Sequence, residues 1–396
     1  MKNQTNQSTI EWREVLLEEI CKIVSGSTPS TSNPEYWDGT INWVTPAELI
    51  DGNNWYYYKT QRKISDKGLK SCSSELFPKG TVMLTSRAPI GKVAIAGTEM
   101  CSNQGFKNLI CDTKQINPEY LYHWLRSKKE FLNSLGHGAT FKEISKKIVS
   151  KIKILLPFRN GHPDLETQKA IVSILEKAEQ LKEKRKQSLK LLDEYVKSTF
   201  NEMFVGKGFE EKKLNQIAEI VRDSINPSKI KDYQYYIGLE HIESETGRVI
   251  DKIETKAIDL KSTKFLFDED CILYGKLRPY LNKIAIPNFK GVCSTDIIPI
   301  REIKNISNKY YLAFLLRQKD YVNNATSLSI GANLPRLSPR SLESFKIPLP
   351  PLPLQQTFAS LVEHVEKLKG KQNQSLKEIE QLFNALMQKA FNGELV

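Results

Sequence analysis

The sequence predicts an α+β protein in which two globular domains alternate with two long helices. The helices are expected to pair as an antiparallel coiled coil, so that the chain forms a pseudo-twofold internal repeat. Three observations support this prediction. The second half of the chain repeats features of the first in the same order, each half ends in a long segment with heptad spacing, and a length of 396 residues suits two or three globular units of roughly 150 residues.

The repeat is clearest toward the end of each half. Residues 168–206 align without a gap with residues 355–393, at an offset of 187, and thirteen of the 39 positions are identical. Upstream, Ile152–Pro157 matches Phe345–Pro350 at an offset of 193. The offset changes because the first copy carries six extra residues around 158–164. The chain is therefore two copies of one plan.

The globular domains are expected at residues 1–161 and 207–351. Both mix short runs of β-forming residues with a helical segment, as in α+β domains. The expected strands and helices are, in chain order, Gly80–Thr85, Pro118–Leu135, Asp270–Tyr274 and Lys309–Asn323.

The long helices are expected at residues 162–206 and 352–396. No Gly or Pro interrupts the first between Thr167 and Val205, and 39 residues at ~1.5 Å each span roughly 57 Å. Apolar residues recur at alternating spacings of four and three, which is typical of a coiled-coil seam. The apolar seam positions are Ile171, Leu175, Ala178, Leu189, Leu192, Val196, Phe358, Val362, Val365, Leu376, Ile379 and Phe383.

Both seams carry polar residues at the same two positions, Lys182 and Arg185 in the first copy and Lys369 and Gln372 in the second. A polar layer of this kind sets the register or the choice of partner at some cost in stability. Matched seams in one chain favour packing of the two helices on each other, in antiparallel orientation. The alternative is that each helix packs on its own globular domain.

The composition narrows the possible functions. The net charge of +12 predicts attraction to polyanions, of which nucleic acid is the commonest. No apolar run approaches the ~18 residues of a membrane span, and the polar N-terminus lacks the apolar stretch of a secretory signal, so a cytoplasmic protein without a membrane partner is expected. The six cysteines and five histidines have no metal-ligand spacing, and no phosphate-binding glycine loop is present. We therefore expect no metal, no cofactor and no catalytic site.

Several strings, present in duplicated order, resemble the specificity (S) subunit of type I restriction–modification systems over essentially the whole chain. The strings that carry the resemblance are Ser25–Ser30, Tyr36–Thr45, Ser86–Lys92, Tyr274–Lys283, Cys293–Asp296 and the Pro-Leu-Pro-Pro-Leu segment Pro348–Leu352. One departure is the stretch 158–164, where family members often have a compact Pro-Pro-Leu turn. It leaves the angle of the first helix open.

The resemblance implies a non-catalytic reader of double-stranded DNA. Two target-recognition domains each read one half of an asymmetric, split site, and the two helices set the spacing and dock methyltransferase subunits, two in number. The restriction/translocase subunits join through the complex, and methylation and cleavage belong to these partners. An alternative is an assembly scaffold of a DNA-defence complex in which base reading is secondary.

Candidate DNA contacts are basic residues for phosphates and short polar or bidentate groups for base edges. In the first domain they are Lys59, Arg62, Lys63, Ser86, Arg87, Lys92, Asn103, Gln104 and Lys107. In the second they are Lys276, Arg278, Tyr280, Asn282, Lys283, Ser294, Thr295 and Asp296. The glycine-bearing turns 136–140 and 330–336 lie at matching places and are expected to approach the DNA backbone. An alternative role for Arg87 and Arg278, which lie close to prolines, is to buttress a turn.

Overall fold

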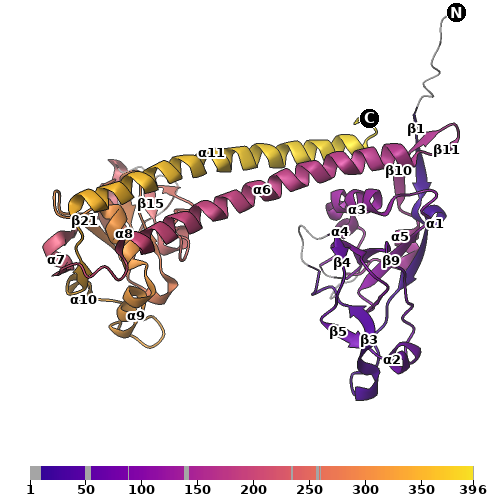
Figure 1. Cartoon of the computed structure of the whole chain (residues 1–396), viewed down its shortest axis with the longest axis horizontal. Helices are drawn as coiled ribbons and strands as arrows, with labels where there is room; N and C mark the ends of the chain where they lie inside the picture. Colours follow the sequence, from indigo (N-terminus) through magenta and orange to yellow (C-terminus); the bar gives the residue numbers. More distant parts are fainter. Residues whose placement is uncertain are drawn as a thin grey trace, which may run out of the picture. The chain divides into compact units, whose positions relative to one another are not determined.

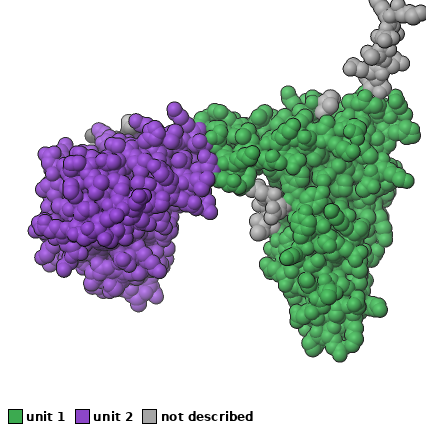
Figure 2. All heavy atoms as spheres, in the orientation of Figure 1, with its two compact units in different colours: residues 1–187, 373–396 green, residues 188–372 purple. Residues whose placement is uncertain are grey.

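The computed structural model describes residues 10–49, 55–87, 89–137, 142–232, 235–255, 258 and 260–395. The chain forms two compact units, shown in green and purple in Figure 2. Unit 1 comprises residues 1–187 and 373–396, and unit 2 comprises residues 188–372. Each unit therefore contains one globular α+β region and one half of each long helix.

Unit 1 is built from short strands. They are β1 (Glu11–Leu16), β2 (Cys21–Ser25), β3 (Trp37–Val44), β4 (Tyr56–Tyr57), β5 (Arg62–Ile64), β6 (Val82–Thr85), β7 (Val93–Ala96), β8 (Cys101–Ser102), β9 (Phe106–Cys111), β10 (Lys153–Arg159) and β11 (His162–Pro163). These strands form sheets in the orders β2-β9-β6-β7-β4, β5-β3-β8 and β1-β10-β11. The strand predicted at 80–85 is β6; its four residues are all buried, as expected of a continuous apolar run.

Unit 2 repeats this plan with different details. Its strands are β12 (Glu211–Lys213), β13 (Ala218–Ile220), β14 (Ser224–Ile225), β15 (Tyr235–Ile237), β16 (Ile253–Glu254), β17 (Lys264–Phe267), β18 (Cys271–Gly275), β19 (Ile284–Ala285), β20 (Gly291–Cys293), β21 (Ile297–Glu302) and β22 (Lys346–Pro348). The sheets have the orders β13-β21-β18-β19, β14-β17-β20-β15-β16 and β12-β22. The strand predicted at 270–274 is β18, again fully buried.

Short helices connect the strands of both units. In unit 1 they are α1 (Leu17–Ile20), η1 (Pro34–Tyr36), α2 (Asp66–Lys70), α3 (Pro118–Ser127), α4 (Lys129–Ser134) and α5 (Lys146–Ser150). In unit 2 they are α7 (Leu214–Ile217), η2 (Pro227–Asp232), η3 (Leu239–His241), η5 (Pro279–Leu281), α8 (Lys309–Leu316), α9 (Lys319–Ser327) and α10 (Pro339–Glu343).

The two helices expected at 118–135 and 309–323 each break once. Lys128, with φ −102° and ψ 18°, separates α3 from α4, and Gln318, with an extended ψ of 145°, separates α8 from α9. A single non-helical residue does not change the apolar spacing on either side of it, so the sequence pattern continues through both breaks.

The long helices are α6 (Leu165–Phe204) and α11 (Leu352–Phe391), each of 40 residues. Asp164 caps the start of α6 by accepting a hydrogen bond from the Thr167 backbone N–H at 3.1 Å. Beyond the ends of the helices lie Gly206 and Gly393, with φ +71° and +77°. Only glycine adopts this left-handed backbone readily, which explains why both copies keep it at the helix end.

In each unit, the first half of one long helix packs against the second half of the other (Figure 1). In unit 1, Leu175 of α6 and Phe383 of α11 share a core, and in unit 2 Phe200 of α6 and Phe358 of α11 have ring centroids 5.3 Å apart. The helices therefore run antiparallel, and the predicted fold class is confirmed. Each helix also packs on a globular region, because both cores include residues of α3 or α8.

Most of the apolar seam positions are buried. The buried ones are Ile171, Leu175, Val196, Phe358, Val362, Val365, Ile379 and Phe383. The half-buried ones are Ala178, Leu189, Leu192 and Leu376.

The polar seam residues lie close to the positions where the two units divide each helix. In unit 1, the Lys182 ammonium lies 4.9 Å from the centre of the Phe383 ring. In unit 2, the Lys369 ammonium lies 2.7 Å from the Asp193 carboxylate and 2.8 Å from that of Glu366. Burial alone would lower the pKa of Lys369, but the hydrogen bonds that its ammonium donates to the two carboxylates outweigh burial and raise the pKa above its usual value. Lys182 and Lys369 of the polar layer therefore each have a partner within their own unit.

A buried glutamine ties each long helix to the short helix of the same repeat. Gln168 accepts a hydrogen bond from the Asn117 backbone N–H at 2.8 Å, and Gln355 accepts one from Asn308 at 2.9 Å. Both glutamine amides also donate to backbone carbonyls, that of Gln115 in unit 1 and those of Ile306 and Pro350 in unit 2. Gln168 and Gln355 are fully buried and occupy identical positions in the repeat.

A buried tyrosine in the first turn of each short helix contacts both a strand and the end of a long helix. Tyr120 donates to the Leu155 carbonyl of β10 at 3.0 Å, and its ring lies 5.3 Å from that of Phe391. Tyr311 donates to the Pro348 carbonyl of β22, and its ring lies 4.8 Å from that of Phe204. Phe391 and Phe204 end the long helix of the other repeat, so each unit encloses the end of a helix that begins in the other unit.

Within the described residues, no helix combines the length and the apolar character that crossing a bilayer requires.

We predict that Phe200→Ala destabilises unit 2 by ~3–5 kcal/mol, because Phe200 is fully buried among Phe204, Tyr311, Phe314 and Phe358. Hydrogen exchange of the α8 amides in the full chain measures this loss. Leu191→Ala is the matched control, because Leu191 lies on the same helix with 62% of its surface exposed. An equal loss in both variants would show that Phe200 is not the centre of this core.

Candidate nucleic-acid interface

In unit 1, three of the candidate residues meet at one ion-pair cluster. Ser86 and Arg87 directly follow β6, and Lys107 lies on the neighbouring strand β9. The buried Lys107 ammonium lies 3.3 Å from both the Ser86 hydroxyl and the Glu143 carboxylate. Arg87 donates to the other Glu143 oxygen at 2.8 Å. Backbone bonds from Ser86 to Gly105 and from Ile144 to Ser86 hold these segments together.

Glu143 forms ion pairs with two cations in this cluster. Burial alone would raise the pKa of Glu143, but the hydrogen bonds from Arg87 and Lys107 outweigh it and hold the pKa below its usual value. Lys107 is 5% exposed, too little to reach a phosphate without leaving Glu143. Its position indicates a brace for the turn rather than a surface contact.

Three further basic candidates of unit 1 are exposed. Arg62 and Lys63 lie on β5, and Lys59 lies in the segment between β4 and β5. The Arg62 guanidinium stacks 3.6 Å from the centre of the Trp37 ring and 5.5 Å from that of Trp43. Stacking orients the guanidinium while leaving its donors available to a phosphate or a base.

The remaining candidates of unit 1 bond within the protein. The Lys92 ammonium donates to the Leu49 carbonyl at 2.6 Å, and the Asn103 side chain accepts from the Gly105 backbone at 2.9 Å. Gln104 is exposed and accepts from the Thr28 hydroxyl at 2.6 Å. Of these three, Gln104 has the greatest access to a partner.

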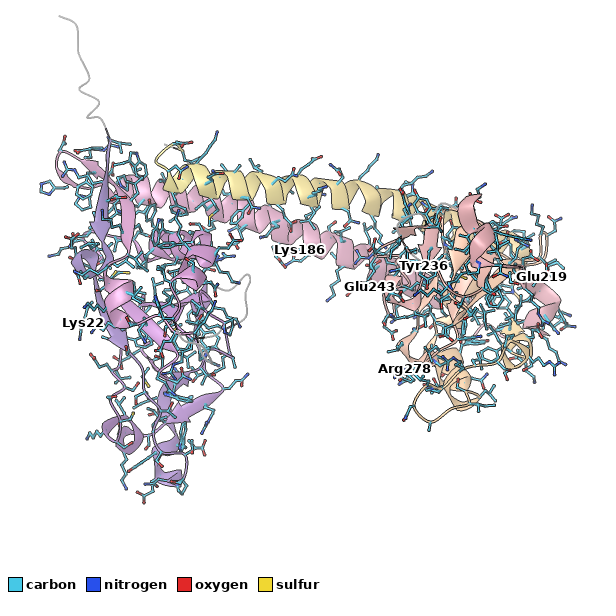
Figure 3. The ribbon with its side chains drawn as sticks, turned by 180° about the vertical axis from the view of Figure 1, so that it is seen from behind. Lys22, Lys186, Glu219, Tyr236, Glu243 and Arg278 are labelled. Atoms are coloured by element: carbon cyan, nitrogen blue, oxygen red, sulfur yellow. The ribbon has the colours of Figure 1, made fainter. Side chains whose placement is uncertain are left out.

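Unit 2 holds the equivalent turn with a different set of residues. The Lys276 backbone donates to the Asp296 carbonyl at 2.9 Å and accepts from Leu337 at 3.0 Å. The Asp296 carboxylate accepts two hydrogen bonds from the Arg336 guanidinium, at 2.8 and 3.3 Å. Arg278 is exposed, and its backbone adopts the left-handed conformation with φ +51°. Figure 3 shows Arg278 at the edge of unit 2 that lies away from α11.

The other candidates of unit 2 divide into exposed and buried groups. Tyr280 is 48% exposed and Thr295 is exposed. Asn282 is buried and donates to Glu245 at 2.8 Å and to the Arg317 carbonyl at 3.1 Å, and the Lys283 ammonium donates to the Leu239 carbonyl at 2.8 Å. The Ser294 hydroxyl accepts from the Asp296 backbone at 3.3 Å. The exposed members lie on the turn that carries Arg278 and in the segment just before β21.

The two clusters are equivalent, with their charges exchanged. In unit 1 a bridge pairs His137 with Glu143, and in unit 2 a bridge pairs Ile330 with Arg336, both at an offset of 193. The bracing residue is therefore an acid in unit 1, where it binds basic partners, and an arginine in unit 2, where it binds Asp296. The same backbone scaffold thus presents different chemistry in the two units.

Glu143 was missed by the sequence reasoning, and Arg336 was included only as the last residue of the turn 330–336. A signal was available, since the offset of 193 aligns Glu143 with Arg336. This alignment alone does not reveal the ion pairs, because Glu143 lies 36 residues from Lys107 and Arg336 lies 40 residues from Asp296 in the sequence. Most of the other turn, residues 138–140, lies outside the described residues.

Among the residues that the structure describes, no group of three or more His, Cys, Asp or Glu side chains could hold a metal ion. The six cysteines are free thiols. Burial lowers the pKa of His123 to about 4, and the His123 ring packs 4.5 Å from that of Trp55. This histidine serves as a neutral part of the core.

Comparison with known proteins places the whole chain in one family. Residues 9–191 and residues 206–381 each match the type I restriction modification DNA specificity domain. A relative from Methanocaldococcus jannaschii, the type I restriction enzyme MjaIX specificity subunit, is 29% identical over 97% of this chain and 94% of its own. The EcoDI specificity subunit from Escherichia coli is 25% identical over 98% of this chain and 89% of its own.

Two solved structures share the fold. A chain from a study of complex assembly and conformational transition in the type I R-M system aligns over 98% of this chain and 100% of its own, with a TM-score of 0.62 and 17% identity. The S subunit of a type I restriction-modification system from M. genitalium aligns over 99% and 98%, with a TM-score of 0.53 and 16% identity. At these identities the likeness concerns the fold alone.

We predict that the Glu143 brace gives unit 1 a pH-dependent stability. Because the pKa of Glu143 is lowered in the folded protein, its ion pairs stabilise unit 1 above the ordinary glutamate pKa and are lost as the pH falls through the lowered value. The stability difference between the wild type and Glu143→Gln should therefore be largest near neutral pH and shrink in acid. Denaturant unfolding followed by tryptophan fluorescence measures it, since all five tryptophans lie in unit 1.

Glu130→Gln is the control for this measurement, because Glu130 is an exposed glutamate on α4 of the same unit. Its difference from the wild type should stay near zero at every pH. A Glu143→Gln difference that does not change with pH would contradict the role given to the brace.

Proposed function

The chain belongs to the type I restriction modification DNA specificity family, and from this premise we propose that it directs a type I restriction–modification complex to its DNA site. The resemblance inferred from the duplicated strings is confirmed by the two family matches. The subunit recognises DNA, and methylation and cleavage are assigned to partner subunits. We assign it no cofactor of its own.

Each globular region reads one half of a split, asymmetric site. The observation that carries this proposal is the pair of equivalent clusters, which share a backbone scaffold but differ in their side chains. Because a half-site is read through side chains, two different clusters favour two different half-sites. The functional modules are residues 1–161 and 207–351, with residues 162–206 and 352–396 as the helical spacers.

The candidate residues divide into two roles under this proposal. The exposed residues meet the DNA directly, with basic groups on phosphates and short polar groups on base edges. They are Lys59, Arg62, Lys63, Arg87, Gln104, Arg278, Tyr280 and Thr295. The buried and half-buried residues position the exposed ones. Their side chains or backbone groups form hydrogen bonds within the units. They are Ser86, Lys92, Asn103, Lys107, Lys276, Asn282, Lys283, Ser294 and Asp296.

The antiparallel helices set the distance between the half-sites and dock two methyltransferase subunits. Pseudo-twofold proteins that read one face of a duplex place their half-sites about one helical turn, or ~34 Å, apart, and a helix of roughly 57 Å can bridge that distance. The restriction/translocase subunits join through the methyltransferase subunits. We place this complex in the cytoplasm, where it meets the DNA that it surveys.

We predict that the methylated site is not a palindrome, because the two reading clusters differ in sequence and in charge. Long-read sequencing that maps methylated bases in cells expressing this chain with its methyltransferase partner measures the site directly. Two unlike half-sites separated by a spacer of fixed length are expected. A palindromic site would overturn the assignment of one half-site to each domain.

We predict that Arg278→Ala weakens binding to the mapped site by ~1–3 kcal/mol if the side chain contacts a base, and that Lys276→Ala weakens it too. Binding to the mapped site and to random duplex is compared at one fixed salt concentration. Lys346→Ala is the control, because Lys346 is an exposed lysine on β22 of the same unit, outside the candidate cluster. Unchanged affinity and methylation in both test variants would remove this turn from the interface.

A further inference from the structure

The turn that follows α9 exposes an unusual amount of apolar side chain. Ile330 has 81% of its surface exposed, and Leu328 and Leu334 on the same segment have 43% and 47%. Tyr280, on the adjoining turn of η5, is 48% exposed. Single exposed apolar residues are common on protein surfaces, but several on one segment indicate a surface that a partner covers.

The segment is held rigidly although its side chains are exposed. Ile330 and Arg336 form two backbone hydrogen bonds with each other, of 3.1 and 3.0 Å, which close the turn. Gly331 has φ +119°, and a Cβ there would lie 2.9 Å from the Leu334 carbonyl oxygen, so the tight turn requires glycine. The turn is therefore a preformed projection that costs little conformational entropy to use.

Contacts with η5 and β21 fix the projection to the candidate interface. The Arg278 backbone donates to the Pro335 carbonyl at 2.7 Å, and its guanidinium lies 3.3 Å from the Asn333 carbonyl. The Arg336 guanidinium is held by Asp296 from the start of β21. Ile330 is thus carried by the same scaffold as Arg278, the residue labelled in Figure 3.

The segments that form the projection and the adjoining turn carry more basic than acidic groups. Segments 274–283 and 328–340 contain Lys276, Arg278, Lys283, Arg336 and Arg340 and no Asp or Glu. Asp296 pairs with Arg336 and Lys283 bonds inward, whereas Arg278 and Arg340 are exposed. Apolar side chains flanked by cations match the chemistry of duplex DNA, which presents phosphates on the outside and apolar base stacks between them.

We propose that Ile330 is an apolar wedge that enters the base stack of the half-site read by unit 2 and locally unstacks it, while Arg278 and its basic neighbours hold the flanking phosphates. This proposal rests on the proposed function. Such a wedge adds specificity without hydrogen bonds to base edges, because base steps differ in the energy needed to unstack them.

The test uses the full chain without its methyltransferase partner, because the partner would itself flip its target base out of the stack. The duplexes carry the mapped site with 2-aminopurine at one position at a time. The fluorescence of 2-aminopurine rises when the base is unstacked. The wild type should raise the signal at one or two adjacent positions of a single half-site. Ile330→Ala should abolish that rise and weaken binding on the order of tenfold, since it removes most of the apolar surface that the DNA buries. Ile330→Leu should restore both.

Ile306→Ala is the matched control, because Ile306 is also an exposed isoleucine, 39% exposed, and follows the end of β21 opposite to Asp296. It should leave the signal and the affinity unchanged. A rise that persists in Ile330→Ala, or specific binding by the wild type without any rise, would overturn the wedge. Loss of methyltransferase capture in Ile330→Ala with unchanged DNA signal would identify a protein interface and also overturn it. No preference of the wild type for the mapped site over random duplex would instead refute the proposed function.

Discussion

The architecture of each unit depends on a buried glutamine at the start of its long helix. A buried amide that lost its partners would cost roughly 1–3 kcal/mol per unsatisfied group, so Gln168 and Gln355 each fix the helix start against the loop before α3 or α8. A tyrosine in the first turn of α3 or α8, Tyr120 or Tyr311, then contacts the strand that precedes the long helix and the last residue of the other long helix. Because both copies keep these residues, the junction between the globular region and its long helix is built in the same way in both units.

The repeat separates what must stay constant from what can vary. The buried glutamines, the tyrosines and the helix-ending glycines are identical in the two copies, and they all act on the helices. The clusters that face outward keep only their backbone pairing, and even the sign of the bracing residue differs between Glu143 and Arg336. A salt bridge of either polarity can brace a turn, so the charge facing the partner is free to change while the turn keeps its shape.

Much of the fold could be predicted from the sequence, because the signals that specify it are local. Heptad spacing located α6 and α11 to within a few residues, aided in α6 by the absence of glycine and proline, and two short apolar runs located β6 and β18. The breaks at Lys128 and Gln318 could not be seen, since they change backbone angles without changing the apolar pattern.

The candidate site was less accessible to sequence reasoning. Conspicuous residues such as Arg62 and Arg278 are indeed exposed. Lys107 looks like a surface cation in the sequence, yet it is buried, because Glu143 arrives from a distant segment to neutralise it. Asn282 and Lys283 likewise bond inward, to groups that only the tertiary fold brings near. Long-range pairing, and not residue type, decides which polar groups remain free.

The division of the chain into units has a topological consequence. Unit 2 is one continuous segment, whereas unit 1 is assembled from both sides of it. The two segments that form unit 1 are in contact, since the Trp12 ring packs against the Gly393 backbone. A Cβ added at Gly393 would lie 2.9 Å from the indole. The first strand and the end of the last long helix therefore belong to one core. Each core also contains residues of the long helix that begins in the other unit, so neither half of the repeat can complete a core from its own residues alone.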